Sequence, residues 1–521
     1  MNLETLKMFN LFQSLLQNPK FNNVLPLFIP LLLVVLFLHK SFSSNGKKTP
    51  PSPPKLPIIG NLHQLGALTH RSLRELSNRY GKLMLLHFGY QPTLIVSSAD
   101  LAQEVLKSND IIVSNRPSSS IAKTFFYNAT DMSFSPYGDY WRQIRSICVS
   151  KLLSTKKVQS LRVIREEETS LIVEKIKQSN GSVFNLREII MSFTNDLICR
   201  ASFGKKYIEN NEGGGNFKKL LNDAMKLLGN NSFKDISPWL GWMDRLKGLD
   251  CEVDRVSKGL DHILENVVQE NQIKMNNEQN NIIHTTQDHY NGMNFVEILL
   301  QAQKDKKVAL QPHSIKAVIM DMFIGGTDTI YTLIEWAMIE IIRHPIVMKE
   351  LKEELKKIVG GKGTKLSEDD LEKLTYLKAV VKETLRLHPP FPMILREFSK
   401  DVNINGYDIS AGTHAIINLW AIQRDQVFWK EPEEFIPERF LDNSYDFNGQ
   451  NFNYIPFGAG RKICPAIGFG VIKAEFAIAT LIHEFDWETP NGSAIDITEI
   501  NGLAVQTRDP PMLIATPVVS N

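Results

Sequence analysis

The sequence predicts a mainly α-helical protein with small β-sheets, an α+β fold. The chain has 521 residues, of which 43% are hydrophobic, so it can bury an extensive core. Beyond Arg71 most segments carry apolar residues at helical spacing, whereas strand-like runs are few and short. A net charge of +2 gives no whole-chain attraction to nucleic acid, because acids and bases nearly balance, but it leaves room for local basic patches.

The predicted elements follow in chain order. The helical segments are Leu101–Lys107, Val158–Gln178, Ser314–Arg343, Val347–Val359, Leu377–Leu387 and Val471–Glu484. The strand-like runs are Leu83–Phe88, Thr93–Val96 and His414–Asn418. Between Gln269 and Asn294 the chain is crowded with Asn and Gln, which predicts a surface loop between helices.

The N-terminal part predicts a membrane anchor. Residues 24–38 are apolar and uncharged, and lysines follow them, which favours one spanning helix with the body on the cytosolic side. A signal peptide is the alternative, since the run is short and contains Pro26 and Pro30, but no small-residue cleavage site follows. Residues 1–23 form an N-terminal extension to which we assign no role.

Residues 39–60 are basic and proline-rich, which predicts a stiff hinge that sets how residues 61–521, the catalytic domain, lie against the membrane. An ordinary linker or a proline-rich peptide ligand is the alternative. The position directly after the anchor favours the hinge.

The four cysteines, Cys148, Cys199, Cys251 and Cys464, are scattered, which excludes a disulfide scaffold and a cysteine-rich zinc module. Cys464 lies in a glycine-rich, basic loop, Phe457–Ala466, that leads into a helical segment. A thiolate in such a loop can be the axial ligand of a haem iron, because the backbone, a cation and the helix N-terminus all favour its negative charge. A buried structural cysteine explains this loop equally well when the loop is taken alone.

The long helix Ser314–Arg343 contains Gly325 and Gly326 in its middle, although each glycine costs a helix about 1 kcal/mol relative to alanine. Glycine here permits close approach of a flat ligand. The adjoining Asp328 and Thr329 then form a proton-delivery pair for dioxygen. A kinked packing helix with a structural aspartate is the alternative.

Two pairs of side chains have helical spacing. Glu383 and Arg386 lie one turn apart, and with Arg439 they would complete a buried network that locks the fold; the alternative is a surface ion pair. Trp141 and Arg145 share a helix face and are both hydrogen-bond donors, as two carboxylates would require. An ordinary amphipathic helix is the alternative for this second pair.

Taken together and in this order, these motifs resemble the cytochrome P450 superfamily of haem-thiolate monooxygenases over essentially the whole chain. Plant microsomal members of family 71 are the most similar in three features: the proline hinge, the Glu335-Trp336 pair and the sequence of Pro437–Phe440. The resemblance implies the cytochrome P450 fold, with haem b between the long central helix and the cysteine loop. It also implies O2 as co-substrate and electrons from NADPH through a membrane-bound reductase that docks on the cysteine side. The expected protein is a monomer in the endoplasmic reticulum membrane, with its catalytic domain in the cytosol.

The resemblance further implies a role for each motif residue. Cys464 would bind the haem iron and Phe457 would shield it, while Asp328 and Thr329 would deliver protons and Glu383, Arg386 and Arg439 would form a structural triad. The residues expected to hold the haem propionates are Trp141, Arg145, Arg396 and Lys462. The residues expected to line the substrate pocket are Ser120, Ile121, Ile324, Gly325, Met393, Ile394 and Leu503.

Three departures from the family pattern stand out. Lys462 replaces the usual arginine of the cysteine loop and so loses a bidentate donor. Ala466 replaces a glycine, which would be costly if this position needs a positive φ. The segment before Leu395, Arg396 and Glu397 is one residue shorter than in related plant enzymes, which reshapes the roof of the pocket.

We therefore expect a monooxygenase that oxidises a small hydrophobic plant metabolite, a terpenoid first, then an indole alkaloid or phenylpropanoid-type compound. One alternative is a haem-thiolate isomerase or lyase that needs no O2, but it has no use for the Asp328–Thr329 pair. The other alternative is a non-catalytic membrane protein that binds haem.

Overall fold

A computed structural model confirms the mainly helical fold with small sheets. The residues it describes are 48–206, 214–230, 232–279, 292–305, 310–360, 365–442 and 444–518. The predicted extension (1–23), the anchor (24–38) and residues 39–47 of the hinge lie outside these described residues.

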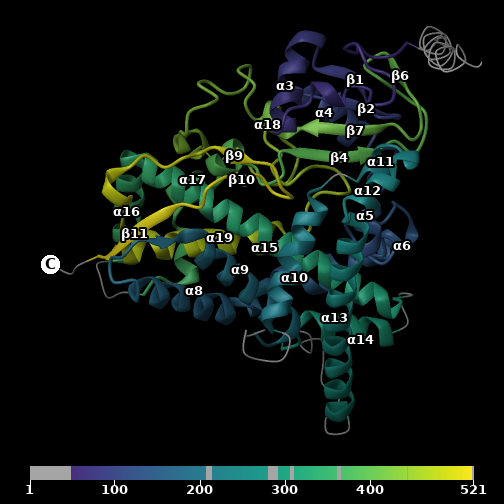
Figure 1. Cartoon of the computed structure of the whole chain (residues 1–521). Coiled ribbons are helices and arrows are strands. Elements are labelled where there is room, and N and C mark those ends of the chain that lie inside the picture. Colours follow the sequence, from purple (N-terminus) through teal and green to yellow (C-terminus); the bar gives the residue numbers. More distant parts are fainter. Residues whose placement is uncertain are drawn as a thin grey trace, which may run out of the picture.

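Helices make up most of the body, and the long α13 extends away from it (Figure 1). The α-helices are α3 (Thr69–Tyr80), α4 (Ala99–Gln103), α5 (Ser120–Phe125), α6 (Asp139–Ile147), α7 (Thr155–Ser160), α8 (Arg162–Lys177), α9 (Leu186–Phe203), α10 (Gly214–Leu228), α11 (Phe233–Ile236), α12 (Trp242–Leu246), α13 (Leu249–Gln279), α14 (Phe295–Lys304), α15 (Pro312–Arg343), α16 (Pro345–Val359), α17 (Thr375–Leu387), α18 (Leu419–Ile422) and α19 (Ile467–Glu484). Short helical turns of other types include η2 (Glu104–Ser108), η3 (Cys148–Leu152), η4 (Pro238–Leu240) and η6 (Pro437–Phe440).

The largest sheet has the order β1-β2-β7-β4 and lies at one end of the molecule beside α3 and α4 (Figure 1). The strands are β1 (Leu83–Phe88), β2 (Gln91–Val96), β3 (Phe184–Asn185), β4 (Met393–Glu397), β5 (Val402–Ile404), β6 (Tyr407–Ile409), β7 (His414–Asn418), β8 (Phe485–Glu488), β9 (Glu499–Ile500), β10 (Gln506–Thr507) and β11 (Met512–Pro517). Strands β2 and β7 are parallel and the other two pairs of this sheet are antiparallel. Strand β4 pairs with β7 without a bulge, with Arg396 opposite Ala415, so the short segment before Arg396 still forms a regular edge strand.

Helix α15 runs through the middle of the largest hydrophobic core, between α9 and α19. Among the described helices it is the one that is long and apolar enough to cross a membrane, but 83% of its apolar window is buried inside the protein. Its composition is therefore explained by its place in the core.

Three predicted elements differ from the structure. The segment Val158–Gln178 breaks at Leu161 into α7 and α8, because Leu161 leaves helical geometry with φ −86° and ψ 4°. The predicted loop from Gln269 is helical as far as Gln279, since the side chain of Met275 stays buried on one face of α13. The segment Leu101–Lys107 falls across the end of α4 and the π-helical turn η2.

The described end of the hinge lies against the body. The carbonyl of Pro51 accepts a hydrogen bond from the main-chain amide of Leu85 in β1. The side-chain amide of Asn61 donates to the carbonyls of Pro53 and Pro54. These contacts extend the sheet end of the molecule, and they fix the path of the chain as it enters the domain.

Candidate active site

The loop before α19 holds Cys464 in a fixed backbone conformation. The Cys464 amide donates to the carbonyl of Phe457 at 3.0 Å, and the ring of Phe457 packs edge-on against Phe447. Gly460 has φ +72°, and a Cβ at this position would lie 2.5 Å from the carbonyl oxygen of Leu106. Only glycine fits there, so the glycines of this loop serve a close backbone crossing.

Ala466 caps the N-terminus of α19 with φ −105°, so the expected cost of a methyl group at this position does not arise. The helix begins at Ile467, four residues before the predicted segment Val471–Glu484, and its N-terminus adjoins Cys464. Burial raises the pKa of Cys464, while the amide of Ala466 and the charges of Arg145 and Arg116 lower it. These groups therefore offset part of the cost that burial imposes on the thiolate of Cys464.

Four cations gather near Cys464: Arg116, Arg145, Arg396 and Lys462. Arg396 and Lys462 are buried, and the other two are half-buried. Burial lowers the pKa of all four, and for Arg396 and Lys462 the repulsion from Arg116 lowers it further, to about 7 in Lys462. Within the described residues none of the four forms an ion pair with a carboxylate.

Three donors converge on the loop Met132–Ser135, which precedes α6. Arg116 donates to the carbonyl of Ser133 at 3.0 Å and Lys462 to that of Ser135 at 2.7 Å. The indole of Trp141 donates to the carbonyl of Met132 at 2.9 Å. The single N–H of Trp141 thus has a main-chain acceptor in this structure, and the predicted contact of Trp141 with a haem propionate stays a prediction.

Arg145 and Arg396 keep donors that the protein does not use. The guanidinium of Arg145 lies 5.9 Å from the centre of the Trp141 ring and has no hydrogen-bond acceptor among the described residues. Arg396 donates to the carbonyl of Leu395 at 2.9 Å and makes no other hydrogen bond within them. A guanidinium has five N–H groups, so all those of Arg145 and all but one of Arg396 are available for planar anions.

Sequence reasoning missed Arg116. It lies in the segment after η2, 279 residues before the carbonyl of Leu395, to which it donates at 3.4 Å. The only local signal is an arginine followed by Pro117 at the end of an apolar run, which indicates no function. The neighbours that give Arg116 its role come together only in the fold.

The same loop carries a buried acid pair, Asp131 and Asp321. Asp131 accepts from the amides of Ser133 and Phe134, and Asp321 from the amide of Met132 at 2.7 Å. Burial raises the pKa of both carboxyl groups, and that of Asp321 is raised further by the charge of Asp131. The pair fixes the loop to α15, and the charges of its carboxyl groups raise the pKa of Arg116 and Lys462, which offsets part of the effect of burial, although neither acid forms an ion pair with these cations.

Opposite the cysteine loop, α15 presents Gly325 and Gly326 for two different reasons. A Cβ on Gly325 would contact no atom within 4 Å, and Gly325 is exposed although the helix around it is buried. A Cβ on Gly326 would lie 2.6 Å from Ile198 of α9. Gly325 thus opens the helix towards an internal space, whereas Gly326 allows close helix packing.

These features fit haem b. A thiol faces the interior at a helix N-terminus, a glycine leaves room for a flat group, and buried cations lack the anions that two propionates would supply. Cys464 would bind the iron, and Arg116, Arg145, Arg396 and Lys462 would hold the propionates.

Asp328 and Thr329 point in different directions from α15, as adjacent helix positions do. The hydroxyl of Thr329 donates to the carbonyl of Gly325 at 2.5 Å and so lies on the open side of the helix. Asp328 is buried towards Tyr331 and the amide of Ala504; burial raises its pKa, and hydrogen bonds from these two groups lower it in part. Thr329 can therefore contact a ligand, while Asp328 lies behind it.

The structure brings Glu383, Arg386 and Arg439 together. Arg386 binds Glu383 through two hydrogen bonds of 2.7 Å, with both side chains fully buried, and Arg439 lies 3.4 Å from the same carboxylate. Arg386 also donates to the carbonyls of Gln423, Pro432 and Glu434. Every member has partners, so this network cannot accept a ligand.

The expected pocket residues separate into two groups. Ser120 and Ile121 begin α5, Ile324 and Gly325 lie on α15, and the backbone of Leu503 meets Gly229 at the end of α10. In β4 the side chains alternate: Ile394 lies beside Gly458 of the cysteine loop, but Met393 packs into the cluster of Leu73, Met84, Leu86, Ile95 and Ile416 on the α3 side. The structure therefore does not bring Met393 to the face that Ile394 and Arg396 share.

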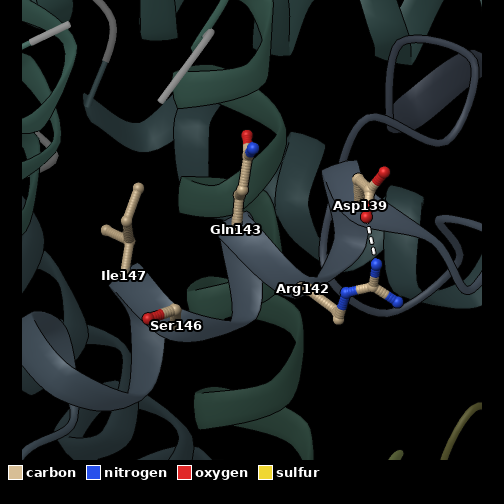
Figure 2. Close-up of a pocket in the computed structure, with 5 residues that line it drawn as sticks. All are labelled: Asp139, Arg142, Gln143, Ser146 and Ile147. Atoms are coloured by element: carbon tan, nitrogen blue, oxygen red, sulfur yellow. Dashed lines mark hydrogen bonds and ion pairs between the residues drawn. The ribbon is translucent and has the colours of Figure 1, made fainter. Parts of the chain in front are cut away.

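The outer face of α6 forms a surface hollow of about 350 Å³ (Figure 2). It is lined by Asp139, Arg142, Gln143, Ser146 and Ile147, and Figure 2 shows Arg142 paired with Asp139. The other face of α6 carries Trp141 and Arg145 towards the interior. Beside the hollow, Arg142 and Arg461 both stack over the ring of Tyr137, so basic side chains cover the surface outside the cysteine loop.

Comparison with known proteins agrees with this site. The family model described as Cytochrome P450 matches residues 50–515. Cytochrome P450 71A25 of Arabidopsis thaliana is 46% identical, over 94% of this chain and 98% of that protein. Norfluorocurarine oxidase of Strychnos sp is 44% identical, over 95% of this chain and 98% of that protein.

Among solved structures, a zebra fish cytochrome P450 with abiraterone superimposes with a TM-score of 0.71. The match covers 86% of this chain and all of that one, at 22% identity. At this level of identity the likeness concerns the fold.

Proposed function

The chain belongs to the cytochrome P450 family, and from that premise we propose that it oxidises a small hydrophobic specialised metabolite of a plant. As a member of the family it is a monooxygenase that uses haem b, O2 and electrons that a reductase takes from NADPH. The observation that carries the site assignment is the thiol of Cys464 beside four cations that have no carboxylate partner.

Haem b held by a thiolate activates O2 so that one oxygen atom enters the substrate and the other leaves as water. The chain's own residues prepare this chemistry. Arg145 and Arg116 favour the charged form of Cys464, and Arg396 and Lys462 offer donors to the propionates. The apolar core around α15 excludes water from the reaction space.

Thr329 and Asp328 are proposed to move protons in sequence. Thr329 lies on the open side of α15 and has a hydroxyl that can turn from the Gly325 carbonyl to a ligand. Asp328, whose pKa is raised by burial, can supply the proton from behind. Thr329→Ala should uncouple NADPH consumption from product and release peroxide; unaltered coupling would remove Thr329 from proton delivery.

The substrate is proposed to be apolar because the candidate pocket residues Ile121, Ile324, Ile394 and Leu503 are aliphatic. Terpenoids lead on this ground. Indole alkaloids gain support from the relative named as norfluorocurarine oxidase, and phenylpropanoid-type compounds follow. The test is microsomal turnover with a library of the three classes, with NADPH and reductase supplied.

The same assay separates the alternatives. Product that forms without NADPH and reductase would indicate an isomerase or lyase and would overturn the proposal. A haem-loaded protein with no product from any of the three classes would favour a non-catalytic haem-binding protein.

The reductase is proposed to dock over α6 and the cysteine loop. Arg142 and Arg461 are more than two-fifths exposed, while the same two elements carry Arg145 and Cys464 inside. This surface is therefore directly outside the thiol. Arg142→Glu should raise the reductase concentration needed for half-maximal turnover and leave substrate binding unchanged, whereas the same change at Arg255 of α13 should alter neither.

The membrane-facing side is proposed to be the surface shared by the hinge and α12. Trp239, Trp242 and Leu246 are 64%, 57% and 77% exposed, which is unusual for such large apolar side chains. The preceding α11 contacts Gly89, whose amide donates to the carbonyl of Ile59 in the hinge, so both segments lie on one side. Together with the anchor at 24–38 this favours a single-pass monomer in the endoplasmic reticulum membrane, testable by microsomal fractionation and protease protection of the full chain.

A further inference from the structure

A lysine lies buried at the crossing of α15 and α19, where the proposed mechanism uses no lysine. Lys473 is 1% exposed, and it lies on α19 two turns after the helix begins behind Cys464. Its ammonium group lies 4.1 Å from the centre of the Phe469 ring. Among the described residues it has one hydrogen bond, to the carbonyl of Gly326 at 3.3 Å, and no carboxylate partner.

The crossing is built so that this contact can form. A Cβ on Gly470 would lie 3.0 Å from Ile330 of α15, and a Cβ on Gly326 would lie 2.6 Å from Ile198 and 3.8 Å from the Lys473 nitrogen. Two glycines, one on each helix, therefore let the helices approach closely. Lys473 follows Gly470 by three residues and so points from the same face of α19.

The carbonyl that Lys473 contacts is next to the one that Thr329 uses. Gly325 accepts from the Thr329 hydroxyl at 2.5 Å, and Gly326 accepts from Lys473. In a regular helix these two carbonyls bond only to the amides four residues later. A carbonyl oxygen has two lone pairs, so each can accept from a side-chain donor as well, and the two extra donors fix this turn from two sides.

Burial, together with the charge of Arg165 on α8, lowers the pKa of Lys473 to about 7. The nearby carboxylate of Glu368 is paired with Arg165 at 2.6 Å and forms no ion pair with Lys473. A buried amine without a counter-charge is costly to the fold, and a methionine of similar length would pack at lower cost. This cost argues for a role beyond packing.

We infer that Lys473 is a positioning residue for the oxidation: by donating to the Gly326 carbonyl it ties the helix that follows the cysteine ligand to the turn of α15 that carries Thr329. The inference rests on the proposed function of Thr329, and it adds Lys473 of α19 to the residues that position the Thr329 hydroxyl. The hydrogen bond fixes the position of the Gly325–Thr329 turn, so that the threonine hydroxyl stays on the ligand side.

The test compares Lys473→Met, which has no donor, with Lys473→Gln, which keeps an uncharged donor. Lys473→Met should lower product formed per NADPH about fivefold, with a matching rise in peroxide, because one hydrogen bond to the turn is lost. Amide exchange in Ile324–Ile330 of the holoenzyme should quicken by a similar factor. Lys473→Gln should restore at least half of both.

Lys316→Met is the matched control, since Lys316 is a nearly buried lysine on the same α15 but binds Asp261 and Glu265 far from the turn. It should leave coupling and the exchange of Ile324–Ile330 unchanged. Normal coupling and exchange in Lys473→Met would overturn the inference, as would a Lys473→Gln variant no better than Lys473→Met.

If Lys473→Met does not take up haem, Lys473→Asn replaces it, because asparagine is polar but too short to reach Gly326. Coupling in Lys473→Asn equal to that in Lys473→Gln would again contradict the inference. The exchange measurement needs no substrate. If wild type oxidises nothing in the metabolite library, the proposed function fails, whereas unchanged exchange in a folded Lys473 variant removes only this inference.

Discussion

Two buried charged regions lie on either side of the cysteine loop, and they differ in one respect. Around Glu383 every charge has a partner, including two hydrogen bonds of 2.7 Å to Arg386. Around Cys464 the side chains of Arg145 and Arg396 form no ion pair with a carboxylate of the described residues. An arginine does not escape this cost by losing its proton, so an anion must come from elsewhere. We call Glu383, Arg386 and Arg439 the complete network, which stabilises the fold. We call Arg116, Arg145, Arg396 and Lys462 the incomplete network, which indicates a ligand site.

The largest effect on the complete network is expected from Glu383→Gln. The change leaves Arg386 buried without a counter-charge, which should lower the free energy of unfolding by about 3 to 5 kcal/mol or prevent folding. Glu434→Gln is the control, because only the main chain of Glu434 joins the network and its side chain is exposed. Denaturant unfolding followed by circular dichroism measures both. Equal stability of the two variants would mean that the triad does not hold the fold.

In the incomplete network, we expect Arg396→Met to have opposite effects in the two forms of the protein: it should not destabilise the haem-free protein, but it should weaken haem binding in the holoprotein. In haem-free protein it removes an unpaired buried cation, so the free energy of unfolding should stay constant or rise by about 1 kcal/mol. In holoprotein it removes a donor to a propionate, so haem transfer to an acceptor protein should quicken about tenfold.

Arg386→Met is the matched comparison for this experiment. It should destabilise the protein with and without haem, because Arg386 has only protein partners. If Arg396→Met lost stability without haem and kept its haem transfer rate, Arg396 would belong to the fold and the contrast between the two networks would disappear.

Much of the fold follows from the sequence, because it depends on local pattern. The apolar spacing in α15 and α19 and the alternation in β1 and β7 give these elements within a few residues of their observed ends. Adjacent residues alone leave the roles of Cys464, Glu383 and Arg386 open, and these roles follow only from the order of all the motifs along the chain.

Some residue roles cannot be predicted from the sequence, because they depend on partners that are distant in the chain or belong to the main chain. Arg116 gains its role from Ser133 and Leu395, which are distant in the chain. The acceptor of the Trp141 indole is a main-chain carbonyl, which no side-chain pattern announces. The Gly325–Gly326 pair was expected to serve a ligand alone, but Gly326 serves the packing of α9 and α19.

A smaller effect on stability is expected for a buried acid, because a carboxyl group, unlike an arginine, can become neutral when it is buried. Burial raises the pKa of Glu475 on α19 to about 7, so this group can become neutral and needs no ligand. Its folded pKa lies above the unfolded value of 4.5, so its contribution to stability is full below pH 4.5 and is lost as pH rises through about 7. Glu475→Gln should therefore exceed wild type in stability by on the order of 1 kcal/mol at pH 8 and not at pH 4. Thermal unfolding across this range measures the difference, and a pH-independent difference would show that Glu475 stays ionised.

The central claim is that Cys464 binds haem iron as a thiolate within the cation cluster. The most direct measurement is the absorbance of the reduced CO complex in Cys464→Ser, with Cys148→Ser as control, since Cys148 is also a buried free cysteine, in the turn after α6. We predict that Cys464→Ser loses the absorbance typical of thiolate-ligated haem and that Cys148→Ser keeps it. An unchanged spectrum in Cys464→Ser would contradict the account.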